Sequence, residues 1–286
     1  MDKLDIEIAV LLYNRAYHAI QVFESLKNNG VNSFTVFFDY ADTPKAKKAQ
    51  GLIEKYLKTS NLNVKKHFYN SKMGLAKAVV KSVSYILKKH DAVIFLEDDC
   101  LTRSGAIRYF KDGLNSLHKN KIIRSISGYT YPINKLYWGK NSELLLSKRF
   151  STWGWATWSD RWLDYKTPNE MLNIIGERKI DISTYGNDIA EYLKNESYIN
   201  GENDVWSITW ILEHFISNSY SVFPRETYIE NIGMDGTGVH CKNTNTFDHS
   251  IHRSLFVLHD WHNIDYYPEN ELIIKRFMEK NSNMIY

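Results

Sequence analysis

The chain has 286 residues, of which 43% are hydrophobic, so it can bury a core as one large domain or two small ones. Its 36 basic residues nearly balance 33 acidic ones, and the net charge of +3 argues against nucleic acid as a partner. The two cysteines, Cys100 and Cys241, form no paired motif, which argues against a disulfide framework or a zinc ribbon. No apolar run is long enough for a signal peptide or a membrane span, so we expect a cytoplasmic protein whose membrane contact is at most peripheral.

The N-terminal part of the chain alternates between short apolar runs and longer amphipathic segments. The expected strands are 6–12, 33–40, 63–70 and 92–97, and the expected helices between them are 16–29, 43–60 and 74–90. Alternation of this kind implies right-handed crossovers between parallel strands. We therefore predict an α/β fold in which helices flank a mostly parallel central sheet.

After residue 100 the alternation gives way to a less regular order. We expect a helix at 104–120, short strands at 122–131 and 143–150, a tryptophan-rich segment at 151–162, a helix at 204–218 and a glycine-rich loop at 231–240. No linker separates these parts, so we predict one compact domain with two halves, 1–100 and 101–286.

The segment "VIFLEDDCL", residues 93–101, carries the clearest chemical signal. Its apolar residues predict a strand buried on both faces, and the acids Glu97, Asp98 and Asp99 follow at once. Because ligands of parallel sheets bind beyond the carboxyl ends of the strands, these acids are expected to face a ligand. Closely spaced carboxylates stay ionised only beside a cation or hydrogen-bond donors, and Mg²⁺ or Mn²⁺ would supply the cation. The alternative is a solvated turn in which Asp99 caps a following helix.

Four segments share the N-terminal half: "AVLLYNR" (9–15), "FFDYAD" (37–42), "NSKMGLAKAV" (70–79) and "LEDD" (96–99). In this order and spacing they resemble the nucleotide-binding half of a GT-A glycosyltransferase. The resemblance implies that this half binds a nucleotide sugar, with Tyr13 and Arg15 near the nucleotide at the end of the first strand. It also implies that Asp39 contacts the uridine and that Gly74 opens a helix beside the nucleotide.

The same resemblance assigns the acidic motif. Asp99 matches the acid that usually meets the metal, and Asp98 matches one that often meets the ribose or the metal. Arg15 and Lys72 are candidates to reach phosphate oxygens, although each is equally well read as a surface charge.

In the C-terminal half, "FSTWGWATW" is followed by "NDVW" and then by "GMDGTGVH". This order is similar to that of the Golgi N-acetylglucosaminyltransferase that begins hybrid N-glycans, and to bacterial surface-polysaccharide transferases of the family 2 type. The resemblance implies that Asp204 is the catalytic base, with Glu202 as the next candidate. The alternative is that Asp204 only caps a helix.

Two further parts of this half are candidates by their residues. His240 follows a loop with Gly233, Gly236 and Gly238 that can bend over a ligand, so it is a candidate third metal ligand or donor to the diphosphate, whereas a lone histidine is more often structural. Because apolar faces of sugars stack on aromatic rings, Trp153, Gly154 and Trp155 are candidates to lie under the donor sugar or beside the acceptor, and core packing is the alternative for the tryptophans.

Together these features predict a glycosyltransferase that uses Mn²⁺ or Mg²⁺. It would move a sugar from a nucleotide-diphosphate sugar, with UDP as the expected nucleotide, to a hydroxyl of a glycan, lipid-linked glycan or glycoprotein acceptor. The predicted chemistry is a direct displacement with inversion, in which Asp204 takes the acceptor proton and the metal neutralises the departing diphosphate.

Two alternatives remain open. A nucleotidyltransferase that makes sugar nucleotides should carry a glycine-rich phosphate loop after the first strand, which "LLYNRAYHAI" is not, and a non-catalytic sugar- or nucleotide-binding module would be favoured by loss of the acids.

Overall fold

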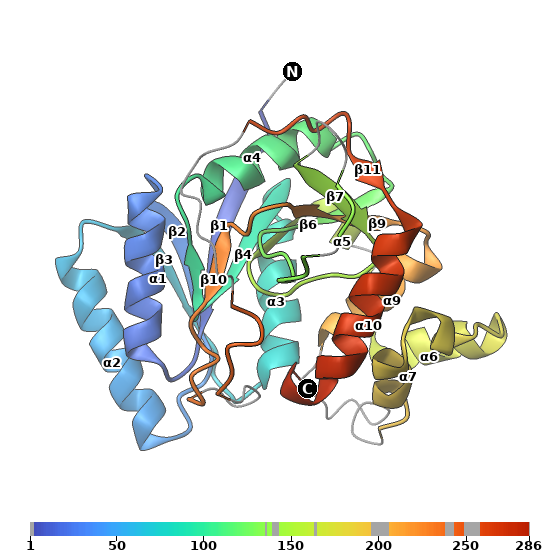
Figure 1. Cartoon of the computed structure of the whole chain (residues 1–286). Helices are drawn as coiled ribbons and strands as arrows, with labels where there is room; N and C mark the ends of the chain where they lie inside the picture. The colour runs from blue at the N-terminus through green and yellow to red at the C-terminus, as the bar shows by residue number, and fades with distance from the viewer. Residues whose placement is uncertain are drawn as a thin grey trace.

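The computed structural model of the chain describes residues 3–134, 136–138, 143–162, 165–195, 206–237, 243–248 and 258–285. Within these ranges the strands form a nine-stranded sheet in the order β11-β7-β9-β6-β8-β4-β1-β2-β3 and a small sheet of β10 and β5 (Figure 1). The strands are β1 Ile6–Leu12, β2 Ser33–Phe38, β3 Asn63–Phe68, β4 Ala92–Glu97, β5 Cys100–Thr102, β6 Ile123–Ser127, β7 Leu144–Ser147, β8 Trp155–Trp158, β9 Tyr220–Pro224, β10 Ile229–Asn231 and β11 Asp265–Tyr266.

Helices cover both faces of the large sheet. They are α1 Ala16–Asn28, α2 Pro44–Thr59, α3 Leu75–Leu87, α4 Ala106–Leu117, α5 Ser159–Trp162, α6 Pro168–Glu177, the 3₁₀ helix η1 Ile182–Tyr185, α7 Asn187–Leu193, α9 Trp206–Ile216 and α10 Pro268–Ile285. None of the helices that the structure describes is both long and apolar enough to cross a membrane.

The fold class predicted from the sequence is confirmed. Strand β1 pairs in parallel with both β2 and β4, and β2 pairs in parallel with β3, so the N-terminal half is a parallel sheet with helical crossovers. Beyond β4 the sheet is mixed, because β8 pairs antiparallel with both β4 and β6, and β7 pairs antiparallel with β9. The parallel pairs β6–β9 and β7–β11 complete it.

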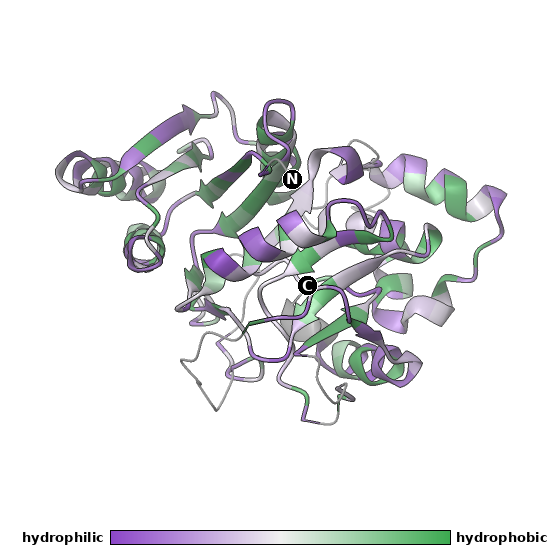
Figure 2. Cartoon of the chain, turned by 90° about the horizontal axis from the view of Figure 1, so that it is seen from above, coloured by the Kyte–Doolittle hydropathy of each residue, from purple (hydrophilic) through white to green (hydrophobic). Residues whose placement is uncertain are grey.

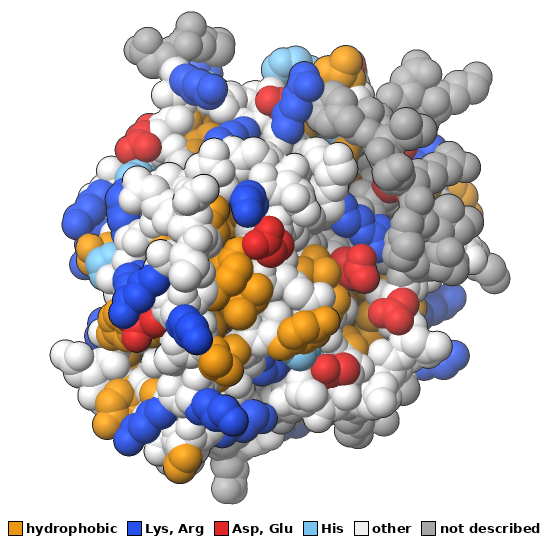
Figure 3. All heavy atoms as spheres, turned by 90° about the vertical axis from the view of Figure 1, so that its left-hand side faces the viewer, with side chains coloured by type: hydrophobic (Ala, Val, Ile, Leu, Met, Phe, Trp, Pro, Cys, Tyr) orange, Lys and Arg blue, Asp and Glu red, His pale blue; other side chains and the backbone are white. Residues whose placement is uncertain are grey.

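The core lies in two layers, one on each side of the large sheet. Alternate residues of β1 point to opposite faces, so Val10 packs with α1, α2 and α4, whereas Leu11 packs with α3 and α9. Figure 2 shows mostly apolar strands in the middle of the sheet and helices with polar outer faces. The side of the molecule that carries α1 and α2 mixes Lys and Arg with exposed hydrophobic side chains (Figure 3).

Helix ends follow from local sequence. Helix α2 begins after Thr43, whose side chain accepts a hydrogen bond from the backbone N–H of Ala46, and Pro44 stands in its first turn. Helix α3 begins after Gly74, whose φ of +75° lies in the region that favours glycine. Both helix starts agree with the predicted boundaries.

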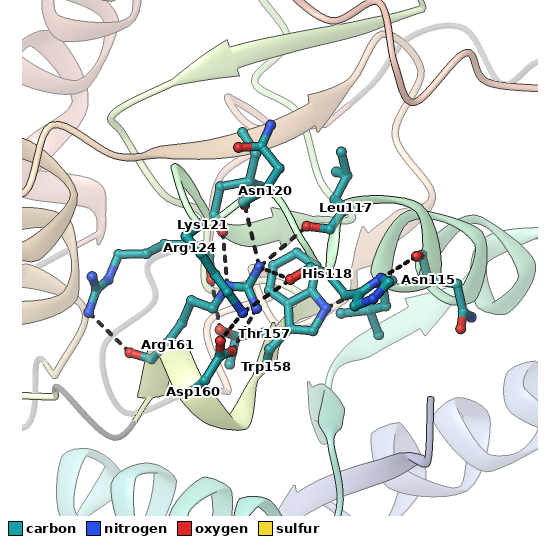
Figure 4. Close-up of polar contacts among 12 residues, drawn as sticks. Asn115, Leu117, His118, Asn120, Lys121, Arg124, Thr157, Trp158, Asp160 and Arg161 are labelled. Carbon is teal, nitrogen blue, oxygen red and sulfur yellow. Dashed lines mark hydrogen bonds and ion pairs between the residues drawn. The ribbon is translucent and has the colours of Figure 1, made fainter. Parts of the chain in front are cut away.

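A buried arginine caps the C-terminal end of α4 (Figure 4). Arg161 donates from Nη2 to the backbone oxygens of Leu117, His118 and Asn120, at 3.3, 2.7 and 3.4 Å. Its guanidinium lies 4.1 Å from the ring centroid of Trp158. Arg161 therefore gives the carbonyls at and just after the end of α4 an additional donor, and it ties α5 to α4.

Candidate functional site

The carboxyl ends of β1, β2 and β4 meet at one edge of the sheet. Leu12 pairs with Phe38 in the neighbouring strand, and Leu11 pairs with Glu97 on the other side. Tyr13, Asp39 and Asp98 follow these three strand ends directly. This edge of the sheet therefore brings together three of the residues that sequence analysis assigned to the nucleotide or the metal.

Two acids at the end of β4 share one arginine. Nη2 of Arg15 lies 2.7 Å from Oδ2 of Asp99 and also forms an ion pair with Oδ1 of Asp98. Asp98 and Asp99 are each only 5% exposed. Such a charge-assisted pair is strong where water is excluded, so Arg15 holds both carboxylates together.

Burial and mutual repulsion set the protonation of this cluster. Burial, together with the charges of Asp99 and Asp98, raises the pKa of Glu97 to about 8. Burial also raises the pKa of Asp98, because it outweighs the attraction to Arg15. Burial disfavours the charged guanidinium of Arg15, yet the two carboxylates outweigh it and keep its pKa above the ordinary value.

Residues 231–237, here called the covering loop, lie over the acids. The backbone N–H of Ile232 donates to the backbone oxygen of Asp99 at 2.9 Å. Gly233 packs so closely that a Cβ there would lie 2.0 Å from Oδ2 of Asp99. Asp235 pairs at 3.2 Å with Nε2 of His18, which belongs to α1. The loop therefore spans from the small sheet to α1 and shields the acids from solvent.

The start of this loop is fixed by the small sheet. Strand β10 pairs antiparallel with β5, and Asn231 stands opposite Cys100. Because Asp99 is followed by β5 and not by a helix, and α4 begins only after Gly105, Asp99 is not a helix cap. The capping alternative for Asp99 is therefore wrong.

A second polar cluster lies at the ends of β1 and β2. Asp39 is 8% exposed and accepts a 2.8 Å hydrogen bond from the backbone N–H of Tyr40. The hydroxyl of Tyr13 donates to Asp42, and Lys72 pairs with Asp42 at 2.8 Å. Tyr13, Asp42 and Lys72 thus join the exit of β1 to the segment before α3, and sequence analysis did not anticipate the role of Asp42.

The tryptophan segment divides between core and site. Trp155 is fully buried among Phe95, Phe150 and Trp206, with ring centroids 5.8, 5.2 and 5.1 Å away, which places it in the core. Gly154 has a φ of +62°, and a Cβ there would lie 2.5 Å from Cγ1 of Ile229, so it too is closely packed.

Trp153 lies nearer to a cavity of about 670 Å³ beside the covering loop. Its ring contacts Tyr129 and Phe247 edge-on, with ring centroids 4.6 and 5.5 Å away, and both of these residues line the cavity. The charged residues of the lining are Arg103, Glu230, Asp235 and Asp248. Asparagine and threonine side chains at 231 and 243–245 add uncharged hydrogen-bonding groups. The wall of the cavity mixes these polar side chains with the rings of Tyr129 and Phe247 and with aliphatic side chains, a character that the glycine-rich loop alone did not predict.

Three assigned residues, Asp204, Glu202 and His240, lie outside the described residues. The described part of the nearby helix, α9, begins at Trp206. The roles assigned to these three residues stay predictions.

The acidic cluster suits a cation by its chemistry. Carboxylate oxygens are the ligands that Mg²⁺ and Mn²⁺ prefer, and Asp98 and Asp99 already hold a cation in the guanidinium of Arg15. Nowhere in the described ranges are three or more His, Cys, Asp or Glu side chains grouped to hold a metal. In this structure Arg15 contacts one oxygen of each carboxylate, Oδ1 of Asp98 and Oδ2 of Asp99.

No family model and no curated protein matches the chain. Among solved structures, the chain is similar to TarS from S. aureus, with 10% identity over 79% of this chain and a TM-score of 0.45. It is also similar to a structure of GalNAc-T7 bound to UDP, GalNAc and Mn²⁺, where the identity is 10% over 79% of this chain and the TM-score is 0.48. It is also similar to 4-diphosphocytidyl-2C-methyl-D-erythritol synthase from Anaerococcus prevotii, with 9% identity over 80% of this chain, 93% of that chain and a TM-score of 0.43. The chain spans 60% of the TarS structure and 43% of the GalNAc-T7 structure. At these values none of the matches establishes a family.

Proposed function

We propose that the chain is a GT-A type glycosyltransferase that transfers a sugar from a UDP-sugar to a hydroxyl of a glycan, lipid-linked glycan or glycoprotein. One observation carries the proposal. A buried pair of acids, Asp98 and Asp99, follows the central strand β4, and the guanidinium of Arg15 holds both of them. The pair lies at the edge where parallel sheets bind ligands.

In this proposal the N-terminal half, 1–100, binds the nucleotide. Asp39 and Tyr13 stand at neighbouring strand ends, where a uridine would lie, and Gly74 lets α3 begin close beside it. Mn²⁺ or Mg²⁺ on Asp99, with Asp98 and His240, would supply positive charge to the departing diphosphate when bound. Arg15, the nearest described cation, would orient the diphosphate through its own N–H donors.

The C-terminal half, 101–286, would bind the acceptor in the cavity beside the covering loop. Three carboxylates against one arginine disfavour an anionic acceptor, whereas the amide groups and the rings of Tyr129 and Phe247 suit the hydroxyls and apolar faces of a sugar. Asp204, with Glu202 as the next candidate, would take the proton from the acceptor hydroxyl. Attack from the side opposite the diphosphate would invert the anomeric configuration.

The test is release of UDP from a panel of UDP-sugars, with and without Mn²⁺, in the wild type and in Asp99→Asn. We expect turnover that falls about 100-fold or more in Asp99→Asn, because the cation that neutralises the departing diphosphate loses a charged ligand. The matched control is Asp112→Asn, which removes an exposed carboxylate that pairs with Arg108 on the surface of α4. Wild-type turnover in Asp99→Asn would refute the role of the acids, and pyrophosphate release from a nucleoside triphosphate and a sugar phosphate would identify a nucleotidyltransferase instead.

A further inference from the structure

Arg15 occupies the position between the acids that a metal ion would need. Its Nη2 contacts carboxylate oxygens of both Asp98 and Asp99, and the three side chains are 14%, 7% and 7% exposed. Nη1 is buried and has no hydrogen-bond partner among the described residues, and it faces Gly233 of the covering loop. One nitrogen of this guanidinium is therefore fully engaged, while another keeps an unused donor beside the same site.

Arg15 neutralises the two acids from a distant part of the sequence, and its own backbone holds it in place. It lies between β1 and α1, and its backbone oxygen accepts a 3.0 Å hydrogen bond from the N–H of Ala19 in the first turn of α1. Two buried carboxylates side by side repel each other strongly, so a cation between them is needed while no other ion is bound. A guanidinium meets that need, because one group can donate to two carboxylates at once.

We propose that Arg15 is a resident counter-ion that competes with the divalent metal for Asp98 and Asp99. In the nucleotide-free protein the guanidinium holds both carboxylates and keeps metal affinity low. When the metal arrives with a nucleotide diphosphate, Arg15 releases the carboxylates and turns its donors, Nη1 included, to the diphosphate oxygens. The inference rests on the proposed function, and it adds that metal and nucleotide bind cooperatively through this one side chain.

A purely supporting role for Arg15 has the opposite consequence. If Arg15 only kept Asp98 and Asp99 in place for the metal, its removal would weaken metal binding. If Arg15 competes, its removal frees two carboxylates whose repulsion a divalent ion then relieves, so metal binding becomes tighter. The sign of the change separates the two roles.

The experiment is a Mn²⁺ titration of the nucleotide-free protein, followed by the electron paramagnetic resonance signal of free Mn²⁺. We expect Arg15→Gln to bind Mn²⁺ about 10-fold tighter or more, the factor that a lost charge-assisted hydrogen bond is worth. Arg15→Lys should fall between wild type and Arg15→Gln, because an ammonium is a point charge without the guanidinium fork. The matched control is Lys27→Gln, which removes one positive charge from the far end of α1, where Lys27 is 47% exposed.

Two further Mn²⁺ titrations test whether the change in affinity arises at Asp98 and Asp99. Adding Asp99→Asn to Arg15→Gln should abolish the gain in Mn²⁺ affinity. Saturating UDP should raise Mn²⁺ affinity more in the wild type than in Arg15→Gln, because the variant has no competitor left to displace. If Arg15→Gln does not fold, the sign of the change in Arg15→Lys decides the question.

Unchanged or weaker Mn²⁺ binding in the Arg15 variants overturns the inference, as does an equal gain in Lys27→Gln. Failure of the proposed function would look different. UDP would then bind neither wild type nor variant, while the effect of Arg15 on Mn²⁺ in the absence of nucleotide would still be measured.

Discussion

Replacing Gly233 by alanine tests how closely the covering loop packs on the acids. A Cβ at position 233 would lie 2.0 Å from Oδ2 of Asp99 and 2.7 Å from Nη1 of Arg15. Favourable contacts between heavy atoms begin near about 3.5 Å, so the loop or the ion pair must shift by roughly 1 Å or more. Gly233 does not have a left-handed φ, so alanine adds no backbone strain and the effect comes from this contact alone.

The magnitude follows from what the shift disturbs. Forcing a methyl group into a closely packed site costs about 1–3 kcal/mol. Loss of the 2.9 Å hydrogen bond from Ile232 to Asp99 would add about 1 kcal/mol. We therefore expect Gly233→Ala to lower the free energy of unfolding by about 2–4 kcal/mol, from those two contributions together.

The assay is urea unfolding followed by tryptophan fluorescence, with thermal unfolding as a second measurement. The matched control is Gly51→Ala in α2, where a Cβ would have no heavy atom within 4 Å. Because alanine favours a helix over glycine, Gly51→Ala should raise the unfolding free energy by about 1 kcal/mol. Equal stability of Gly233→Ala and wild type would show that the loop does not pack on Asp99 as described.

Four further substitutions probe separate parts of the molecule. Asp39→Ala should raise the dissociation constant for UDP, measured by calorimetry, more than it lowers turnover, because a nucleotide contact persists through the reaction; an unchanged UDP affinity would refute that placement. Arg161→Lys should destabilise the fold in urea by about 1–3 kcal/mol, because a single ammonium cannot replace the three guanidinium nitrogens that donate to Ile123, Asp160 and His118; wild-type stability would contradict it. Burial lowers the pKa of His214 to about 3, whereas the unfolded chain protonates it near 6.5, so its contribution to stability is complete above pH 6.5 and is lost as the pH falls toward 3. Between pH 7.5 and 5.5 the wild type should therefore lose about 1.4 kcal/mol more unfolding free energy than His214→Gln, and parallel pH profiles would contradict the buried neutral imidazole. Asp204→Asn should slow transfer by about 10²–10⁴ with UDP binding intact if Asp204 is the base, whereas a helix cap would tolerate asparagine with little change in rate.

The strands of the N-terminal half could be predicted from sequence because their signals are local. The apolar runs around Val10 and Leu96 are buried on both faces, and strand β4 has the predicted bounds, 92–97. The turn residues Thr43 and Gly74 mark the helix starts by chemistry that acts within a few residues. Alternation of these elements then fixes a parallel sheet, because few other topologies connect them.

The C-terminal half could be predicted only in part because its pairing is not local. Strand β8 is four residues long and lies antiparallel between β4 and β6, a place that nothing within "WATW" specifies. Trp155 and Trp153 look alike in the sequence, yet Trp155 is in the core and Trp153 lies near the cavity. Their difference depends on contacts with residues such as Phe247, about a hundred positions away in the chain.

The acidic motif shows the same division at the site itself. A strand that ends in three acids predicts a buried anionic cluster and a need for a cation, and both conclusions follow from local sequence. The identity of the cation does not follow from local sequence, because Arg15 lies 83 positions before Asp98 and reaches it only through the parallel pairing of β1 with β4. That pairing places the residues that follow both strands at one edge of the sheet, so a basic residue after one strand can neutralise acids after its neighbour. An acidic strand exit therefore predicts a metal site only after the residues that follow the adjacent strands have been checked for a competing arginine or lysine, and here that check finds Arg15.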